Sequence, residues 1–282
     1  MKYSLFLFAL IAIVSCKKYE PQLGDPPTEA DTEFSAIPSS ATPNVLELAS
    51  ANQAVLCRWD FGNGTTAEGT EVTAEYPYAG TYTIKLTVFT KGGSKSATKE
   101  VTIVNDDLSL LSNPIFGLLT GGLSGPGYKV WYIDSTASGN MGVGPDPESA
   151  LGPIPEYWSA GPNEKPNCGL YNTRYTFTLS GFGFDMVTNG DVYVHNSLSA
   201  NFPGSFENLN DYTAPYGDKL GESWLLTEGG DENTITISNN AFIGFYTGVN
   251  TYRILELTDS TMSLQYADHQ GGLFWYAKLK SI

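Results

Sequence analysis

The sequence has few of the residues that bind metals or form disulfide frameworks, since its 282 residues include only three cysteines and two histidines. Cys16 ends an apolar N-terminal segment, whereas Cys57 and Cys168 fall in regions that we assign to different domains. We therefore expect two buried thiols and no disulfide framework. Two histidines and two remaining cysteines without close spacing also argue against a zinc site. We expect no metal and no cofactor.

Positive charge is scarce too, because the chain has 15 Lys and Arg residues but 30 Asp and Glu residues, which gives a net charge of −15. Residues 1–15 carry Lys2 and no acid, so removing them subtracts one positive charge and leaves −16. This balance excludes nucleic acid as an ordinary partner. It also disfavours anionic membrane surfaces and strongly anionic polysaccharides, unless a local basic patch opposes the global sign. Neutral glycans remain the easier class of ligand.

Catalytic signatures are missing from the chain. It has no G-x-S-x-G motif and no E-x-D-x-x-E strand of the kind used by retaining endoglucanases. The acids of 228–232 indicate a solvated turn. His195 lies at a predicted strand end and His269 lies in a predicted turn, and a role of either histidine as a general base is weakly supported. The acidic loop 146–148 lacks the spacing of an EF-hand and is interpreted as a solvated loop. We therefore expect no enzyme, with a glycoside hydrolase as the weakest alternative.

No apolar run is long enough to span a bilayer, but the N-terminus has the order of an export signal. Lys2 is followed by the apolar run 5–14 and then by Ser15 and Cys16. The sequence Ile13-Val14-Ser15-Cys16 resembles a bacterial lipobox, which implies cleavage after residue 15 and lipidation of Cys16. Residues 16–35 then form the lipid anchor and an extended tether that is rich in proline and acids.

Aromatic residues make up 13% of the chain, and 30 glycines and 16 prolines accompany them, which is typical of many strands joined by tight turns. In 36–104, apolar and polar residues alternate along 55–61 and 82–88, as in strands with one buried face. The motif Trp59-Asp60-Phe61-Gly62-Asn63-Gly64, with Tyr78-Ala79-Gly80-Thr81-Tyr82 after it, closely resembles a PKD domain. The resemblance implies a small Ig-like β-sandwich that acts as a spacer, with Trp59 in its core.

Residues 105–107 read as a polar hinge, and 108–282 are long enough for one larger antiparallel β-sandwich or jelly-roll domain. A short helix is expected in 108–119, followed by a strand at 129–133. Asn189 and Gly190 predict a type I′ hairpin turn. Further strands are expected at 175–179, 182–187, 191–195, 224–226, 234–238, 242–247, 252–257, 262–266 and 273–279. The predicted fold class is all-β.

The segment 129–165 combines Trp and Tyr rings with glycines and prolines, and 134–172 contains six prolines and reads as one long irregular loop. Aromatic rings on loops offer flat apolar faces that can stack on sugar rings. We expect Trp131, Tyr157 and Trp158 to stack on glucose units, with Asp134, Asn163, Glu164 and Lys165 bonding the hydroxyls. Trp224 is a further candidate, while Trp275 alternates with Leu273 and Ala277 and fits a core better.

The motifs around Trp131-Tyr132-Ile133-Asp134, Pro155-Glu156-Tyr157-Trp158 and Gly190-Asp191-Val192-Tyr193 resemble Bacteroidetes surface glycan-binding lipoproteins of polysaccharide-utilisation loci. The resemblance implies a lipoprotein at the outer membrane, facing the cell surface, that binds a neutral β-glucan such as laminarin beside a glycan transporter. The alternative is a structural or adhesion lipoprotein, in which the aromatic rings are buried and the loops contact another protein.

Overall fold

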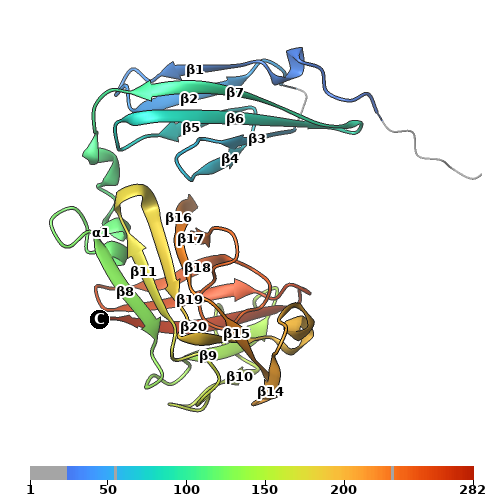
Figure 1. Cartoon of the computed structure of the whole chain (residues 1–282), viewed down its shortest axis with the longest axis vertical. Helices are drawn as coiled ribbons and strands as arrows, with labels where there is room; N and C mark the ends of the chain where they lie inside the picture. Colours follow the sequence, from blue (N-terminus) through green and yellow to red (C-terminus); the bar gives the residue numbers. More distant parts are fainter. Residues whose placement is uncertain (1–23, 54–55, 230–231) are drawn as a thin grey trace, which may run out of the picture.

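The computed structural model describes residues 24–53, 56–229 and 232–282. Two β-rich domains follow one another along the chain and lie end to end (Figure 1). The predictions for the signal segment, for Cys16 and for the first part of the tether, 17–23, fall on residues outside the described ranges. The rest of the predicted tether, 24–35, packs on the first domain instead of extending freely, since the Thr90 hydroxyl donates to the Asp25 carbonyl at 2.8 Å and Lys95 pairs with Glu29 at 2.6 Å. In the described ranges, no helix is long and apolar enough to cross a membrane.

The first domain packs a three-stranded sheet, in the order β1-β2-β5, and a four-stranded sheet, in the order β4-β3-β6-β7. Its elements are η1 (Ala30–Thr32), β1 (Phe34–Pro38), β2 (Val45–Ser50), β3 (Leu56–Asp60), β4 (Thr66–Glu68), β5 (Glu71–Glu75), β6 (Gly80–Thr90) and β7 (Gly93–Ile103). The predicted alternation is confirmed, since Cys57 and Trp59 are fully buried whereas Leu56 is 60% exposed. Trp59 Nε1 donates to the Gly69 carbonyl at 2.8 Å, so the core role of Trp59 is confirmed.

The second domain is built on a ten-stranded antiparallel sheet in the order β10-β9-β20-β19-β18-β17-β16-β12-β11-β8. Strand β20 also pairs with β8, so eight strands close into a barrel-like ring, and β9 and β10 extend from β20. The expected all-β class is confirmed. The strands of this sheet are β8 (Tyr128–Ile133), β9 (Met141–Pro145), β10 (Trp158–Ser159), β11 (Arg174–Thr178), β12 (Gly183–Val187), β16 (Lys219–Gly229), β17 (Glu232–Ile237), β18 (Thr251–Leu257), β19 (Thr261–Ala267) and β20 (Leu273–Ser281).

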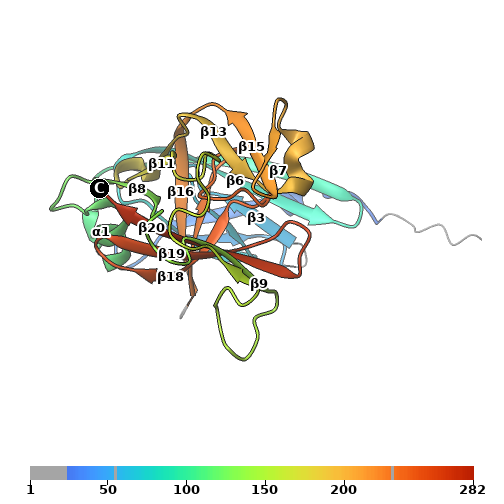
Figure 2. The same ribbon diagram turned by 90° about the horizontal axis from the view of Figure 1, so that it is seen from below.

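A small three-stranded sheet, β13-β15-β14, lies on one side of the ring (Figure 2). It consists of β13 (Gly190–Val194), β14 (Phe206–Asn208) and β15 (Asp211–Tyr216), and η3 (Ser180–Phe182) and η4 (Asn196–Asn201) precede β12 and β14. The 189–190 turn has left-handed backbone at both positions, with φ of 58° and 104°. It joins strands of different sheets, however, so the predicted hairpin is wrong, because β13 pairs with β15 instead of β12.

Three other local predictions are also wrong. Residues 242–247 form no strand beyond an isolated bridge between Val194 and Tyr246, although Phe242 and Phe245 are buried in the core. The segment 134–172 is not one irregular loop, because it contains β9 and β10. Glu148 is not a solvated acid, since it forms an ion pair with Arg253 and accepts a hydrogen bond from Gln265.

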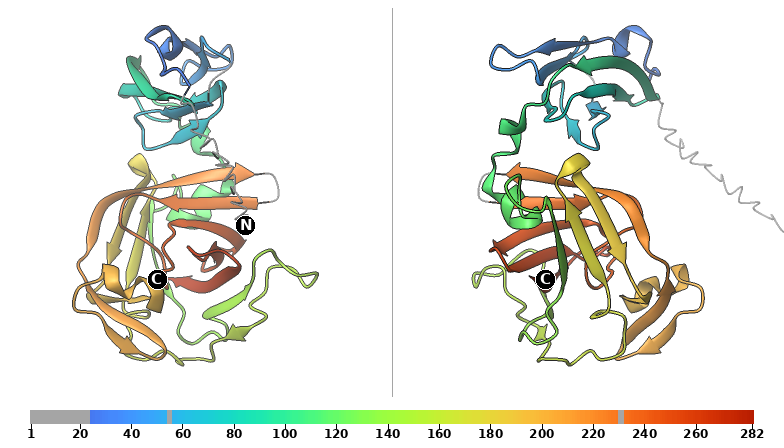
Figure 3. Two further views of the ribbon diagram at one scale, coloured as in Figure 1. Left: turned by 90° about the vertical axis from the view of Figure 1, so that its right-hand side faces the viewer. Right: turned by 60° about the vertical axis from the view of Figure 1, so that its left-hand side comes forward.

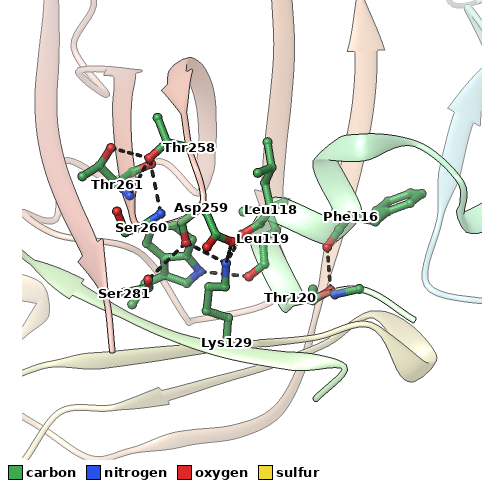
Figure 4. A network of polar contacts seen from close by, with 12 residues as sticks. Phe116, Leu118, Leu119, Thr120, Lys129, Thr258, Asp259, Ser260, Thr261 and Ser281 are labelled. Carbon is green, nitrogen blue, oxygen red and sulfur yellow. Dashed lines mark hydrogen bonds and ion pairs between the residues drawn. The ribbon is translucent and has the colours of Figure 1, made fainter. Parts of the chain in front are cut away.

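The region 108–120 forms two short helical elements, η2 (Leu108–Leu111) and α1 (Pro114–Thr120). Asn113 caps α1 through its side chain, and Pro114 occupies the first turn, where no amide donor is needed. The last carbonyls of α1 are held by the next strand. Lys129 Nζ donates to Leu118 O at 2.8 Å (Figure 4). Trp131 Nε1 donates to Leu119 O at 2.9 Å. Strand β8 therefore fixes the end of the helix.

The connection between the domains, residues 105–107, is not a free hinge. Asp106 accepts a hydrogen bond from the Ala79 amide at 2.7 Å, and Asp107 accepts one from the Thr42 hydroxyl at 2.8 Å. The Asp107 amide also donates to the Pro77 carbonyl. The polar residues of the connection are thus tied to the first domain, and the chain enters the second domain along one side of the junction (Figure 3).

Candidate functional site

A pocket of about 260 Å³ in the second domain is lined by residues of β9 and β10 and of the turn between β14 and β15. These strands lie at the end of the molecule away from the first domain (Figure 1). The floor of the pocket comes from the sheet and its walls come from a loop after β10 and from the turn between β14 and β15. The lining residues are Met141, Val143, Trp158, Glu164, Lys165, Asn210, Asp211 and Trp275.

The floor of the pocket is a row of apolar side chains across three neighbouring strands. Trp158 on β10 is in register with Val143 on β9, and Val143 is in register with Trp275 on β20. Cross-strand partners point to the same face of a sheet, so the three side chains form one surface. Strand β10 is the edge of the sheet, and Trp158 is only partly buried there, whereas Trp275 is 7% exposed.

Lys165 supplies the cation of the pocket and is itself 7% exposed. Its ammonium donates to the Leu209 carbonyl at 3.1 Å and to the Tyr193 hydroxyl at 3.4 Å. It also lies over the Trp158 ring, 4.9 Å from the ring centre. In the described residues no acid forms an ion pair with Lys165. Since an ammonium has three N–H donors, one of them remains for a ligand.

The opposite wall begins with the tight turn at Leu209 and Asn210, both with left-handed backbone at φ of 53° and 74°. Asp211, the first residue of β15, is 8% exposed, and one of its carboxylate oxygens accepts from the Asn196 amide at 3.1 Å. Burial raises the pKa of Asp211, while the hydrogen bond from the Asn196 amide and the positive charge of Lys165 oppose that rise. The wall therefore offers a carboxylate with acceptor capacity left.

The inner end of the pocket is held by a polar cluster that contains both histidines of the chain. Trp275 Nε1 donates to the buried Asp268 carboxylate at 3.0 Å. The ring nitrogens of His195 and His269 lie 3.7 Å and 3.3 Å from the same carboxylate. Ser197 lies between the two rings, with its hydroxyl 2.7 Å from His195 Nδ1. This cluster fixes the Trp275 ring from behind.

The structure brings together three of the seven residues that were predicted to bind a ligand, namely Trp158, Glu164 and Lys165. Tyr157 is 63% exposed but does not line the pocket, and neither does Asn163, whose amide donates to the Ser135 carbonyl at 2.7 Å. Glu164 is itself engaged, because it accepts from the Gly161 amide at 2.5 Å.

The predictions for Trp131 and Asp134 need correction. Trp131 has no exposed surface, because its side chain packs in the main core, so it offers no face for stacking. Asp134 forms an ion pair with Lys280 at 3.0 Å and accepts from Thr136, away from the pocket. Trp224 is likewise buried, at 1% exposure. The core position expected for Trp275 is confirmed, although its ring also closes the pocket.

Sequence reasoning missed Asn210 and Asp211, which lie more than forty positions after Lys165 in the chain. A local signal did exist, since Asn and Asp after an apolar residue are typical of a tight turn. Nothing in the local sequence, however, indicates that this turn faces Trp158. Among the described residues, no group of three or more His, Cys, Asp or Glu side chains is placed to hold a metal ion.

Comparison with known families identifies the first domain. Residues 33–103 match the family model of the PKD domain. The PKD domain expected from the Trp59 motif is thus confirmed. The second domain is not covered by this match, and no curated protein matches the chain in sequence.

Three solved structures are similar to parts or most of the chain. The PKD1 domain of Vibrio anguillarum Epp is 23% identical, with a TM-score of 0.22, over 26% of this chain and 90% of its own. The PKD1 domain of the Vibrio cholerae metalloprotease PrtV is 24% identical, with a TM-score of 0.22, over 26% of this chain and 94% of its own.

The third is a structure of carbohydrate-binding modules from the β-sandwich superfamily, at 15% identity and a TM-score of 0.21, covering 89% of this chain and 92% of its own. These matches are to non-catalytic modules and indicate no enzyme family.

Proposed function

We propose that the second domain is a non-catalytic carbohydrate-binding module and that its pocket binds a neutral polysaccharide, with a β-glucan such as laminarin as the first candidate. The observation that carries this proposal is the partly exposed Trp158 at the mouth of a pocket whose walls hold Lys165 and Asp211. Aromatic and aliphatic floors with a few placed polar groups are typical of small-ligand sites.

The chemistry of the lining suits a ligand with many hydroxyl groups. The floor of Trp158, Val143 and Trp275 can contact the C–H face of a sugar ring. A hydroxyl group both donates and accepts, so it can accept from Lys165 and donate to Asp211 at the same time. The lining contains one cation and two carboxylates, those of Glu164 and Asp211, which disfavours a strongly anionic sugar.

The arrangement of the chain also supports the proposal that the protein is a lipoprotein, anchored through Cys16 at the outer membrane and facing the cell surface. The described chain begins at the PKD end, and β9, β10 and β14 lie at the opposite end of the molecule (Figure 1). An anchor before the PKD domain would therefore point the pocket away from the membrane. In that position the pocket could deliver glycan to an outer-membrane transporter complex.

Affinity electrophoresis of the chain without its signal segment tests the proposal, with gels that contain laminarin, mixed-linkage β-glucan, xyloglucan, starch or mannan. We expect retardation in a β-glucan gel and its loss in Trp158→Ala. Tyr157→Ala is a matched control, because Tyr157 is the adjacent aromatic residue but does not line the pocket. Unretarded migration of the folded protein in every gel would contradict glycan binding, and release of reducing sugar would contradict a non-catalytic module.

A further inference from the structure

We infer that the pocket holds the end of a glycan chain, one terminal sugar ring with at most part of the next, and does not bind the interior of a chain. This inference rests on the proposed function and concerns the same site. Three features of the pocket support it: the length of its floor, its closed inner end and the contact between its two walls.

The floor is short. It spans the three adjacent strands β10, β9 and β20, which corresponds to two inter-strand distances, or roughly 10 Å. The pocket volume of about 260 Å³ is close to the lower limit of small-molecule sites, roughly 300 Å³. A floor of this length has no room for the row of successive sugar rings that an extended groove would bind.

The inner end of the floor is closed. The row of cross-strand partners continues from Trp275 to Tyr266 on β19, but Tyr266 is 3% exposed. Beside Trp275 stand the rings of Phe245 and His195, at 4.6 Å and 5.8 Å between ring centres. Asp268 holds the indole in place at the same end. A glycan chain therefore has no exit past Trp275.

The two walls meet each other. Lys165, from the loop after β10, donates to the carbonyl of Leu209 in the turn before β15, and the two residues are 44 positions apart in sequence. This hydrogen bond joins the wall that carries Glu164 to the wall that carries Asp211. The outer end of the floor lies at Trp158, where, in the part of the chain that the structure describes, β10 pairs with β9 alone and Trp158 stays partly exposed. A glycan that enters at Trp158 and reaches Trp275 must therefore enter with one end of its chain.

Calorimetric titration of the same protein tests this inference. The probes are linear β-1,3-gluco-oligosaccharides of increasing length and a cyclic β-glucan, which has no chain ends. If the site takes a chain end, the dissociation constant should change by less than roughly threefold from the trisaccharide to the hexasaccharide. Each linear chain should bind one protein, and the cyclic glucan should bind at least roughly tenfold more weakly than the linear hexasaccharide.

Two results would overturn the inference but leave glycan binding intact: affinity that rises steeply with every added unit, or a cyclic glucan that binds as well as the linear one. The failure of the proposed function looks different, because then neither the linear oligosaccharides nor any polysaccharide of the gel panel would bind. Trp158→Ala should abolish the heat of binding for every linear probe, which places the measured event in this pocket.

Discussion

Two tryptophan–lysine pairs in the second domain use the same residue types for different purposes. Lys129 lies 5.6 Å from the ring centre of Trp131, and Lys165 lies 4.9 Å from that of Trp158. Lys129 has three acceptors, namely Leu118 O, Asp259 O and an Asp259 carboxylate oxygen, at 2.8 to 3.0 Å (Figure 4). An ammonium has three donors, so Lys129 is satisfied and acts as a clamp on α1.

In the second pair, Lys165 and Trp158, the bonding capacity of the ammonium is not fully used by the protein. Lys165 donates to two neutral oxygens, and the nearby Asp211 carboxylate is not within ion-pair distance among the described contacts. Trp131 is fully buried, whereas Trp158 is partly exposed on an edge strand. The comparison shows that a Trp–Lys pair becomes a candidate ligand site where a donor and part of a ring face remain unused.

The largest expected effect is that of truncating the buried tryptophan. Trp131→Ala removes a fully buried indole and the donor to Leu119 O, and we expect a loss of about 3–5 kcal/mol in the free energy of unfolding. Trp158→Ala should cost much less stability, because its ring is partly exposed, but should abolish retardation in glucan gels. Urea unfolding curves of both variants measure the difference. Equal losses of stability would remove the distinction between the pairs.

Replacing each of the two lysines should change the stability of the protein by a smaller amount, and the two replacements should act in different directions. Lys129→Met leaves the Leu118 carbonyl and Asp259 without their charged donor, and should lower stability by about 2 kcal/mol. Lys165→Met removes a nearly buried charge for which the described residues provide no ion-pair partner, so stability should stay equal or increase, while glycan binding weakens. Thermal melts combined with affinity gels distinguish these outcomes. Loss of folding in Lys165→Met would show that this ammonium is a structural clamp as well.

A pH-dependent effect separates the two acids beside these lysines. Folding raises the pKa of Asp211 because burial disfavours the carboxylate. A carboxyl with a raised pKa favours the folded state when protonated, so stability is lost as the pH rises from the ordinary value of about 4 through the pKa in the folded protein. Asp211→Asn does not titrate. We expect its melting temperature to exceed that of the wild type at neutral pH by roughly 2–4 °C.

The gain in Asp211→Asn should disappear in acid, below the ordinary pKa, where both proteins carry a neutral side chain. Asp259→Asn is the control, because Asp259 is 92% exposed at its side chain and pairs with Lys129. It should lose stability at neutral pH instead of gaining it. A difference between Asp211→Asn and the wild type that is the same at every pH would contradict this account of Asp211.

Sequence patterns predicted the PKD domain well, because its motif and its alternation are local. Trp59 and the strand around it needed only period-2 alternation and a glycine turn. In the second domain, Trp158, Glu164 and Lys165 were found because they lie within eight positions of one another. The fold then brings them to one pocket.

The remainder of the site depends on long-range pairing, which local patterns do not contain. Val143 and Trp275 meet Trp158 only through the register of β10, β9 and β20. Asp211 reaches the pocket because β15 pairs with β13 instead of continuing the main sheet. Trp131 was misassigned for the same reason: the strand at 129–133 was predicted, but its pairing with both β11 and β20, which buries Trp131, was not.

The smallest expected effect is that of Tyr157→Ala, which asks whether the stacking surface is confined to the pocket. Tyr157 is 63% exposed and next to Trp158, but consecutive residues of an extended chain point to opposite sides, and only Trp158 lines the pocket. We expect a change in unfolding free energy within about 0.5 kcal/mol and unchanged retardation in glucan gels. If Tyr157→Ala weakened binding as much as Trp158→Ala, the ligand would have to span both sides of β10, and a closed pocket could not be the whole site.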